Sequence, residues 1–208
     1  MKKYYTILCF LLLNCYFAQG YKYFSVDTVT IKTTKNFEKG NFYAVTAEQF
    51  KYYLHLSKKK YKIVYAFTNR CKPCMEKLPL IVNFAKENKD KLEMYYLTDL
   101  YSIPDFVTIS NLMKSNGSEA YMYNILDDAN NFNTQKNKYI YTIPSEKTGK
   151  PVKVDRYMYF TQKLAPKHKD YGYSLVLLYN EDSKLIYAST YLEKKEEVLG
   201  KLNSYLKE

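Results

Sequence analysis

The sequence predicts an α/β fold, a central mixed sheet flanked by helices, because strand and helix patterns alternate along much of the chain. The continuous apolar run 63–67 is typical of a buried central strand, and a helical pattern follows it over 71–88. A strand pattern at 92–97 and a helical pattern at 104–114 repeat this order. Parallel strands joined by right-handed helical crossovers explain the alternation. A hairpin over 175–188 and a last helix are expected to close the fold.

Two segments are expected before the central strand. Apolar residues at alternate positions in 21–32 predict one or two short strands, which form an N-terminal extension. A helix is expected after Thr46, because Thr46 followed by Gln49 is a capping-box pattern. That helix carries its apolar residues on one face: Phe50, Tyr53 and Leu54.

The helix after the central strand has its own start and spacing signals. Pro73 suits the first turn of a helix, where its missing N–H is not needed. Apolar residues then recur at helical spacing, at Met75, Leu78, Val82 and Ala85. The helix 104–114 carries Phe106, Ile109 and Met113 in the same way. The pair Asn116-Gly117 is typical of the end of a helix.

The segment 118–172 has the weakest pattern in the chain. It is rich in Asn, Lys and Tyr and is broken by prolines, so we expect an insertion before the final hairpin, with strand or helix pieces at 139–143 and 156–164. The hairpin strands follow at 175–179 and 185–188. For the last helix, Thr190 with Glu193 forms a second capping-box pattern, and Val198, Leu202 and Leu206 form the apolar stripe.

The first twenty residues are typical of a secretory signal peptide. Lys2 and Lys3 precede a short apolar run over 4–13, and small residues at 18–20 form a cleavage site. We therefore expect a single mature domain over 21–208 that is exported to a periplasmic or extracytoplasmic location. The apolar run is shorter than the roughly 20 residues that span a bilayer. Retention of this segment, or lipidation at Cys15, would instead leave the protein anchored to the membrane.

Composition and charge narrow the class of protein. Apolar residues make up 47% and aromatic residues 17% of the 208 residues, which excludes a disordered chain and suits one domain with a buried core. Loss of Lys2 and Lys3 lowers the net charge from +11 to about +9. The lysines are scattered along the chain, so we expect a solvated basic surface and no nucleic-acid partner.

The cysteines carry the clearest chemical signal. Removal of the signal peptide removes Cys9 and Cys15 and leaves Cys71 and Cys74. A pair two residues apart closes too small a loop to stabilise a fold, so a local role is expected for it. Residues three apart in the first turn of a helix share a face, and the two sulfurs can therefore bond.

The expected helix start also favours a reactive thiol. Free backbone N–H groups and the positive end of the helix dipole stabilise a thiolate at Cys71. Arg70 and Lys72 add positive charge beside it. Together these effects lower the expected pKa of the Cys71 thiol by on the order of one unit.

Two alternatives to a reactive pair stay open. The cysteines could form an inert structural pair. They could also hold a metal, but a tetrahedral structural site takes four Cys or His ligands, and neither His55 nor His168 has ligand spacing. We expect no metal and no cofactor in a single chain.

The region from Tyr61 to Leu97 resembles the thioredoxin superfamily, in particular exported bacterial thioredoxin-like proteins of the cytochrome-maturation type. Pro73 matches the active-site proline, Pro79 stands where the family kinks its active-site helix, and Phe67 lies at a position that is often aromatic. The closing hairpin and helix resemble the family's final ββα unit. The resemblance covers about two thirds of the mature chain and leaves 118–172 unmatched.

The sequence departs from the family pattern at three positions. Tyr65 stands where the family has a buried acid or its polar substitute, and Arg70 where a tryptophan is common. Ser174 stands where the family has the cis-proline that faces the disulfide, so Tyr173 and Ser174 are the expected substrate-facing loop. With a different hairpin register, Pro144 would take that place instead.

The resemblance implies a thiol–disulfide oxidoreductase in which Cys71 attacks, Cys74 resolves, and Arg70, Lys72 and Pro73 support them. The implied partners are a client protein with a disulfide or a dithiol and, for a reductase, an electron donor in the membrane. The direction of transfer, the clients and the oligomeric state stay open. The alternatives are a thioredoxin-fold binding module with idle cysteines, and a carrier of a metal or cluster.

Overall fold

The computed structural model describes residues 23–25, 42–100, 103–118, 120–125, 141–145, 148–166, 168, 172–190 and 192–207. The expected signal peptide lies outside these residues, together with Cys9 and Cys15. In chain order the elements are β1 (Tyr23–Ser25), β2 (Phe42–Val45), α3 (Ala47–Leu56), β3 (Tyr61–Phe67), α4 (Lys72–Glu87), β4 (Leu92–Thr98), α5 (Ile103–Ser115), β5 (Tyr121–Ile125), β6 (Tyr141–Pro144), β7 (Pro151–Val154), α6 (Arg156–Leu164), β8 (Leu175–Tyr179), β9 (Leu185–Ala188) and α7 (Lys195–Lys207).

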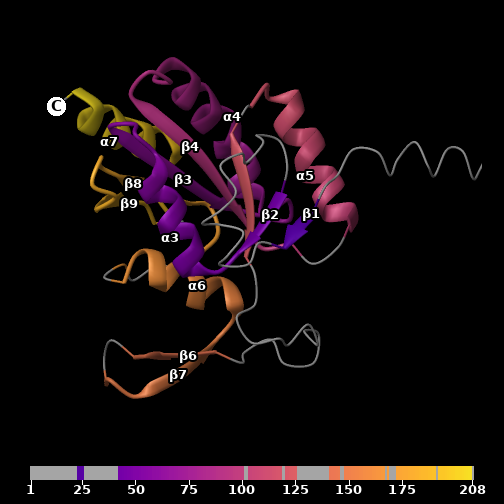
Figure 1. Ribbon diagram of the computed structural model, residues 1–208, viewed down its shortest axis with the longest axis vertical. Coiled ribbons are helices and arrows are strands. Elements are labelled where there is room, and N and C mark those ends of the chain that lie inside the picture. Colours follow the sequence, from indigo (N-terminus) through magenta and orange to yellow (C-terminus); the bar gives the residue numbers. More distant parts are fainter. Residues whose placement is uncertain are drawn as a thin grey trace, which may run out of the picture.

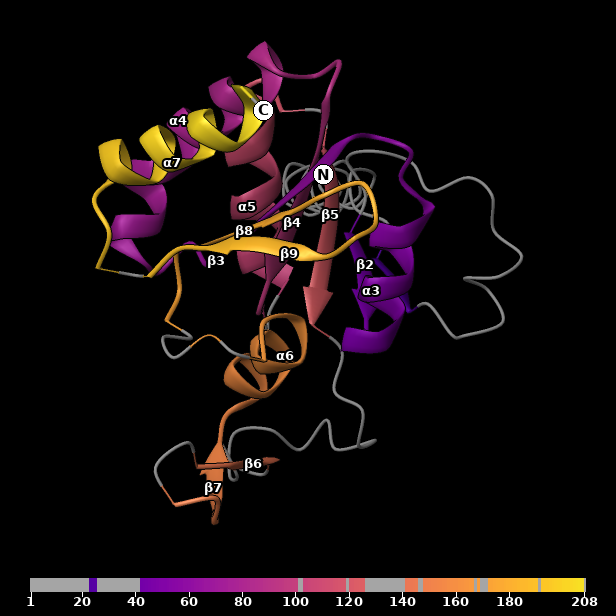
Figure 2. The ribbon, with the colours of Figure 1, turned by 90° about the vertical axis from the view of Figure 1, so that its left-hand side faces the viewer.

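A mixed seven-stranded sheet forms the centre of the molecule (Figure 1). Its strand order is β1-β2-β5-β4-β3-β8-β9. The strands from β1 to β3 in this order run parallel to their neighbours, whereas β8 pairs antiparallel with β3 and β9 antiparallel with β8. The expected mixed sheet flanked by helices is therefore confirmed. Figure 2 shows α4 and α7 on one side of the sheet and α3 and α6 on the other.

The sheet separates two apolar cores, and β3 contributes to both. Tyr65 and Phe67 face the core beneath α4, α5 and α7, whereas Val64 and Ala66 face the core beneath α3 and α6. Every residue of β3 is buried. A strand buried on both faces has no polar side, which explains why its residues 63–67 form a continuous apolar run instead of an alternating one.

Several sequence signals act as predicted. The Thr46 hydroxyl accepts a hydrogen bond from the Gln49 amide (3.2 Å), and the Gln49 side chain accepts one from the Thr46 amide (2.8 Å), so the capping box starts α3. Gly117 follows α5 with a positive φ of 61°, a conformation that glycine adopts without steric cost. The hairpin strands have the predicted bounds, and the predicted stripe of α7 is buried.

The start of α7 differs from the prediction. The Thr190 hydroxyl accepts a hydrogen bond from the Glu193 amide (3.2 Å), as a capping residue would, but the helix begins only at Lys195. The bond stabilises a turn in the segment between β9 and α7. This turn places Glu193 beside the first half of the helix, where it accepts a bond from Lys201 (2.5 Å).

Two parallel strands, β2 and β5, were not predicted. Strand β5 has a polar residue in its second half, Asn124, which is buried and bonds to both backbone groups of Leu100. The segment 118–172, expected as an insertion, therefore supplies an internal strand of the main sheet. It also supplies α6, which covers one face of that sheet, and the separate two-stranded sheet β6–β7.

The helix α6 is attached to the main sheet through a buried ion pair. The Arg156 guanidinium donates to the carboxylate of Asp99, which follows β4, and the two side chains are only 13% and 2% exposed. The Tyr173 hydroxyl donates to the same carboxylate (3.1 Å). This network joins α6 to the loop that precedes β8.

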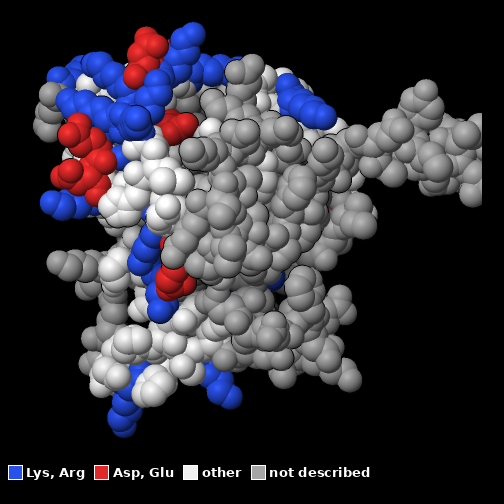
Figure 3. Space-filling view, viewed as in Figure 1, with Lys and Arg blue, Asp and Glu red and all other residues white. Residues whose placement is uncertain are grey.

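Within the described ranges, no helix is both long enough and apolar enough to cross a membrane. Charged side chains of both signs are interspersed over the upper left of the face in Figure 3, where α4 and α7 lie. The described basic residues on that part of the face therefore alternate with acidic ones and form no continuous basic patch there, as expected for a solvated surface.

We predict that Arg156→Met lowers the free energy of unfolding by about 3 kcal/mol, because it leaves the Asp99 carboxylate buried without its cation. Lys163→Met is the matched control on the same helix, since Lys163 pairs with Glu48 at 3.9 Å through exposed side chains and should cost less than about 1 kcal/mol. Urea unfolding of the three proteins measures both values. Equal costs for the two variants would contradict the anchoring role.

Candidate functional site

The cysteines lie at the junction between the carboxyl end of β3 and the start of α4. The backbone amide of Cys71 donates to the carbonyl of Thr68 (3.2 Å), which closes a tight turn between the two elements. Cys71 is the N-cap of α4, and Cys74 lies in its first turn. The two residues form a disulfide with their Cα atoms 5.2 Å apart. Cys71 is partly exposed, whereas Cys74 is fully buried.

The helix start acts directly on the sulfur of Cys71. The amide of Cys74 donates to this sulfur (3.2 Å), in the manner of an N-cap side chain. The helix behind it is 16 residues long, so its dipole is fully developed at this end. When the disulfide is open, a negative charge at Cys71 is stabilised by both effects. The arrangement is therefore that of a nucleophilic thiol backed by a buried second thiol.

The structure gives the predicted supporting residues different surroundings. The exposed Arg70 side chain forms an ion pair with Asp105 of α5 (3.2 Å), and Asn69 donates to the same carboxylate (3.0 Å). Part of the positive charge that was expected to act on Cys71 is thus offset by Asp105, and the contact anchors the loop before the cysteine. Lys72 and Pro73 are exposed in the first turn of α4.

Tyr65 lies directly beneath the first turn of α4. Its hydroxyl donates to the carbonyl of Cys74 (2.8 Å) and lies 3.3 Å from the hydroxyl of Ser174. A phenol has one proton, which the carbonyl receives, so Ser174 is the donor of the second bond. Burial raises the pKa of Tyr65 far above its usual value, and the side chain therefore stays neutral.

Ser174 lies where the predicted hairpin register places it. Its amide donates to the carbonyl of Ala66 on β3 (3.0 Å), one residue before β8 begins. Its φ is +73°, an uncommon conformation for a residue with a side chain. Pro144 instead pairs with Pro151 in the separate sheet β6–β7, so the alternative register is wrong.

Tyr173, the other residue of the expected substrate-facing loop, is half-buried. Besides its bond to Asp99, its ring lies 4.1 Å from that of Tyr157 on α6, centroid to centroid. The loop that carries Ser174 therefore contacts α6 through Tyr173, in addition to its covalent connection to β8.

No family model matches this sequence, and no curated protein matches it. Solved structures with a similar backbone include a thioredoxin-like protein in its oxidised form, with 14% identity over 77% of this chain and 82% of that one and a TM-score of 0.45. A second is the thioredoxin domain of a thiol-disulfide oxidoreductase from Bacteroides vulgatus, with 11% identity over 71% of this chain and 80% of that one and a TM-score of 0.46. A third is an exposed lipoprotein thioredoxin from Streptococcus pneumoniae, with 16% identity over 73% of this chain and 89% of that one and a TM-score of 0.41. These are structures that the backbone of this chain resembles, and its own architecture is the mixed sheet flanked by helices described above.

Two of the predicted departures from the family pattern lie in contact with each other. The buried-acid position holds Tyr65 and the cis-proline position holds Ser174, and their hydroxyls share a hydrogen bond. The pair fills the space beneath Cys74 with neutral groups. Sequence reasoning identified both positions but not their contact, because residues 109 positions apart meet only when β8 pairs with β3.

Two acidic residues near the cysteines were not predicted as part of the site. Asp99 follows β4, and Asp105 lies in the first turn of α5. Because β3 and β4 are parallel, residues after the two strands lie at the same edge of the sheet. This rule, applied to the sequence, could have placed both near Cys71.

The structure shows no clustered metal ligands in the described ranges. No group of three His, Cys, Asp or Glu side chains there could hold an ion. His55 lies in the last turn of α3 and His168 follows α6, both on elements other than α4.

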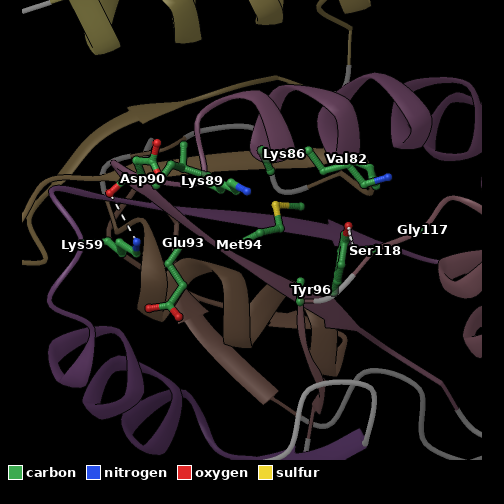
Figure 4. Close-up of a pocket in the computed structure, with 13 residues that line it drawn as sticks. Lys59, Val82, Lys86, Lys89, Asp90, Glu93, Met94, Tyr96, Gly117 and Ser118 are labelled. Atoms are coloured by element: carbon green, nitrogen blue, oxygen red, sulfur yellow. Dashed lines mark hydrogen bonds between the residues drawn. The ribbon is translucent and has the colours of Figure 1, made fainter.

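A surface pocket of about 620 Å³ lies at the other end of α4 (Figure 4). Its lining comes from the second half of that helix, from the first half of β4 and from residues after α5, and includes Val82, Met94 and Ser118. Lys59, Lys86 and Lys89 are at its rim in the close-up. Neither Cys71 nor Cys74 lines this pocket.

We predict that Ser174→Pro, which would introduce the family's proline, lowers the free energy of unfolding by about 3 kcal/mol or more. Proline requires φ near −65° and has no amide to donate to Ala66. Ser174→Gly is the control, because glycine keeps the positive φ and the amide and loses only the hydroxyl bond, at a cost of about 1 kcal/mol. Thermal and urea unfolding measure both. A Ser174→Pro protein as stable as the original would contradict this backbone geometry.

Proposed function

We propose that this protein is an extracytoplasmic thiol–disulfide oxidoreductase that exchanges disulfides with client proteins through Cys71 and Cys74. One observation carries the proposal: the disulfide joins a partly exposed sulfur at a helix N-cap to a fully buried one in the same turn. A purely structural disulfide needs neither exposure nor a helix amide directed at one of its sulfurs.

Two successive nucleophilic displacements at sulfur complete the reaction in the reducing direction, with one electron pair transferred to the client overall. The Cys71 thiolate attacks one sulfur of a client disulfide, a mixed disulfide forms, and the other client sulfur leaves as a thiolate. The Cys74 thiolate then attacks the Cys71 sulfur, and the bond between Cys71 and the client breaks. The client is left with two reduced sulfurs, and the protein with the Cys71–Cys74 disulfide. The reverse sequence oxidises a client dithiol.

Location and partners follow from the sequence signals. An N-terminal signal segment supports export, and a protein outside the cytoplasm meets clients whose cysteines form disulfides. To act repeatedly as a reductase, the protein needs a dithiol donor, for which we propose a membrane protein that faces the same compartment. We propose that a client backbone approaches the loop of Tyr173 and Ser174, where the half-buried Tyr173 is the accessible residue and the fully buried Ser174 is linked to the Cys74 carbonyl through Tyr65.

We predict that Cys74→Ser accumulates mixed disulfides with client proteins, because Cys71 can still attack but no second thiol resolves the product. Cys71→Ser is the control and should accumulate none, since the buried Cys74 cannot be reached. Non-reducing electrophoresis of cell extracts, followed by identification of the trapped chains, measures this. Equal trapping by both variants, or by neither, would favour an idle binding module or a metal carrier.

We also predict that the Cys71 thiol in the reduced protein has a pKa below the usual value of about 8.5, by on the order of one unit. The rate of alkylation by a thiol reagent as a function of pH, compared between the Cys74→Ser and Cys71→Ser proteins, assigns the value. An unshifted Cys71 pKa, together with no reduction of insulin, would show that the helix start does not activate this sulfur.

A further inference from the structure

A buried lysine lies one turn beyond Cys74 on α4. Lys77 is only 5% exposed, and within the described part of the chain its ammonium group has no hydrogen-bond partner. An ammonium carries three donors and is costly to bury unless an anion or acceptors compensate it. A buried, unpaired ammonium therefore suggests that its partner appears in another state of the protein.

The helix places Lys77 next to Cys74. Residues three apart lie on the same face of a helix, with Cβ atoms about 5–6 Å apart. Cys74, Lys77 and Leu78 are all buried, which confirms that this face is turned to the core. Side chains of a helix leave the backbone tilted toward the N-terminus, so the Lys77 side chain starts in the direction of the turn that contains Cys74.

The charged neighbours of Lys77 come from the segment before α7. Burial lowers the pKa of Lys77, and the negative charge of Glu193 opposes this change. The Glu193 carboxylate is already bonded to the Tyr187 hydroxyl (2.6 Å) and to Lys201 (2.5 Å), and it makes no ion pair with Lys77. Its negative charge is thus shared with another cation.

The other titratable groups on the elements packed against α4 do not supply a free anion. On these elements, the tyrosines in the core beneath α4 are Tyr61 and Tyr65 of β3, Tyr96 of β4, Tyr187 of β9 and Tyr205 of α7. Burial raises the pKa of Tyr65, Tyr96 and Tyr187 well above the usual value, so these three stay neutral. Of the acidic residues, Asp105 of α5 pairs with Arg70, and Glu196 and Glu197 are exposed at the start of α7. On the buried face of α4 that Lys77 shares, Cys74 is the residue that becomes negative on reduction.

We infer that Lys77 is the counter-charge of the Cys74 thiolate in the reduced protein. This inference rests on the proposed function. When an incoming thiolate attacks Cys71, the Cys71–Cys74 bond breaks and its electron pair stays on Cys74. When the disulfide closes, the same thiolate attacks Cys71 and the client sulfur leaves. Lys77 exchanges no electrons and no atoms in either step; its charge stabilises Cys74 as leaving group and as nucleophile.

The test measures the pKa of Cys74 as the sole thiol of the full chain, in a Cys9→Ser, Cys15→Ser, Cys71→Ser protein. Ultraviolet absorbance of the thiolate follows its titration even when the sulfur is buried. We predict that Lys77→Met raises the Cys74 pKa by at least about one unit, a tenfold smaller thiolate fraction at a fixed pH below it. Lys77→Arg should keep the pKa near the original value. Lys86→Met, on the far half of the same helix, controls for net charge.

An unchanged Cys74 pKa in Lys77→Met would overturn the inference. Lys77→Gln provides a second neutral variant if the methionine protein does not fold. Unfolding of the oxidised Lys77→Met protein distinguishes the counter-charge role from a purely structural one. Loss of an unpaired buried charge should leave the free energy of unfolding unchanged or increased. Trapping by Cys74→Ser should be the same with and without the Lys77→Met substitution, since only Cys71 attacks in that step. Failed trapping would therefore refute the proposed function, and the titration would still decide the role of Lys77.

Discussion

The site depends on one constraint, the abrupt change from β3 to α4 at Cys71. Because β3 is buried on both faces and lies in the middle of the sheet, the direction in which it ends is fixed by two cores at once. The turn that follows is closed by a backbone bond between Cys71 and Thr68, and its outer side is held by Asp105. The amide end of the helix is thus presented to a sulfur at a fixed position. A helix that started one residue later would direct its free amides away from Cys71.

The side chain beneath the cysteines is neutral, whereas a buried acid at that position would carry a negative charge. A carboxylate beneath Cys74 would oppose formation of a thiolate there, and it could take up the thiol proton. Tyr65 does neither, because it is neutral and its proton is held by the Cys74 carbonyl. Lys77 lies on the same buried face of the helix, and in the reduced state that we infer, its positive charge faces Cys74. The thiol proton of Cys74 must then be taken up by a group other than Tyr65.

Local signals predicted most of the fold, and contacts between distant residues account for the rest. The capping box of α3, the stripe of α7 and the run of β3 depend on neighbouring residues, and each was confirmed. The strands β2 and β5 are four and five residues long, too short for a reliable period, and Asn124 breaks the apolar pattern of β5. That asparagine is buried only because Leu100 provides both of its backbone partners. Such compensation cannot be recognised from local sequence.

The same distinction separates the predicted from the unpredicted part of the site. The cysteines, their helix and Ser174 follow from spacing and hairpin register. Lys77 does not, because a lysine at a helical position is expected to be exposed, and its burial depends on how other elements pack against α4. The mid-loop turn at Thr190, which moves the helix start to Lys195, places Glu193 in the segment between β9 and α7. The deviation from the predicted capping therefore accompanies a contact that the local sequence does not show, because the negative charge of Glu193 acts on Lys77, more than a hundred positions earlier in the chain.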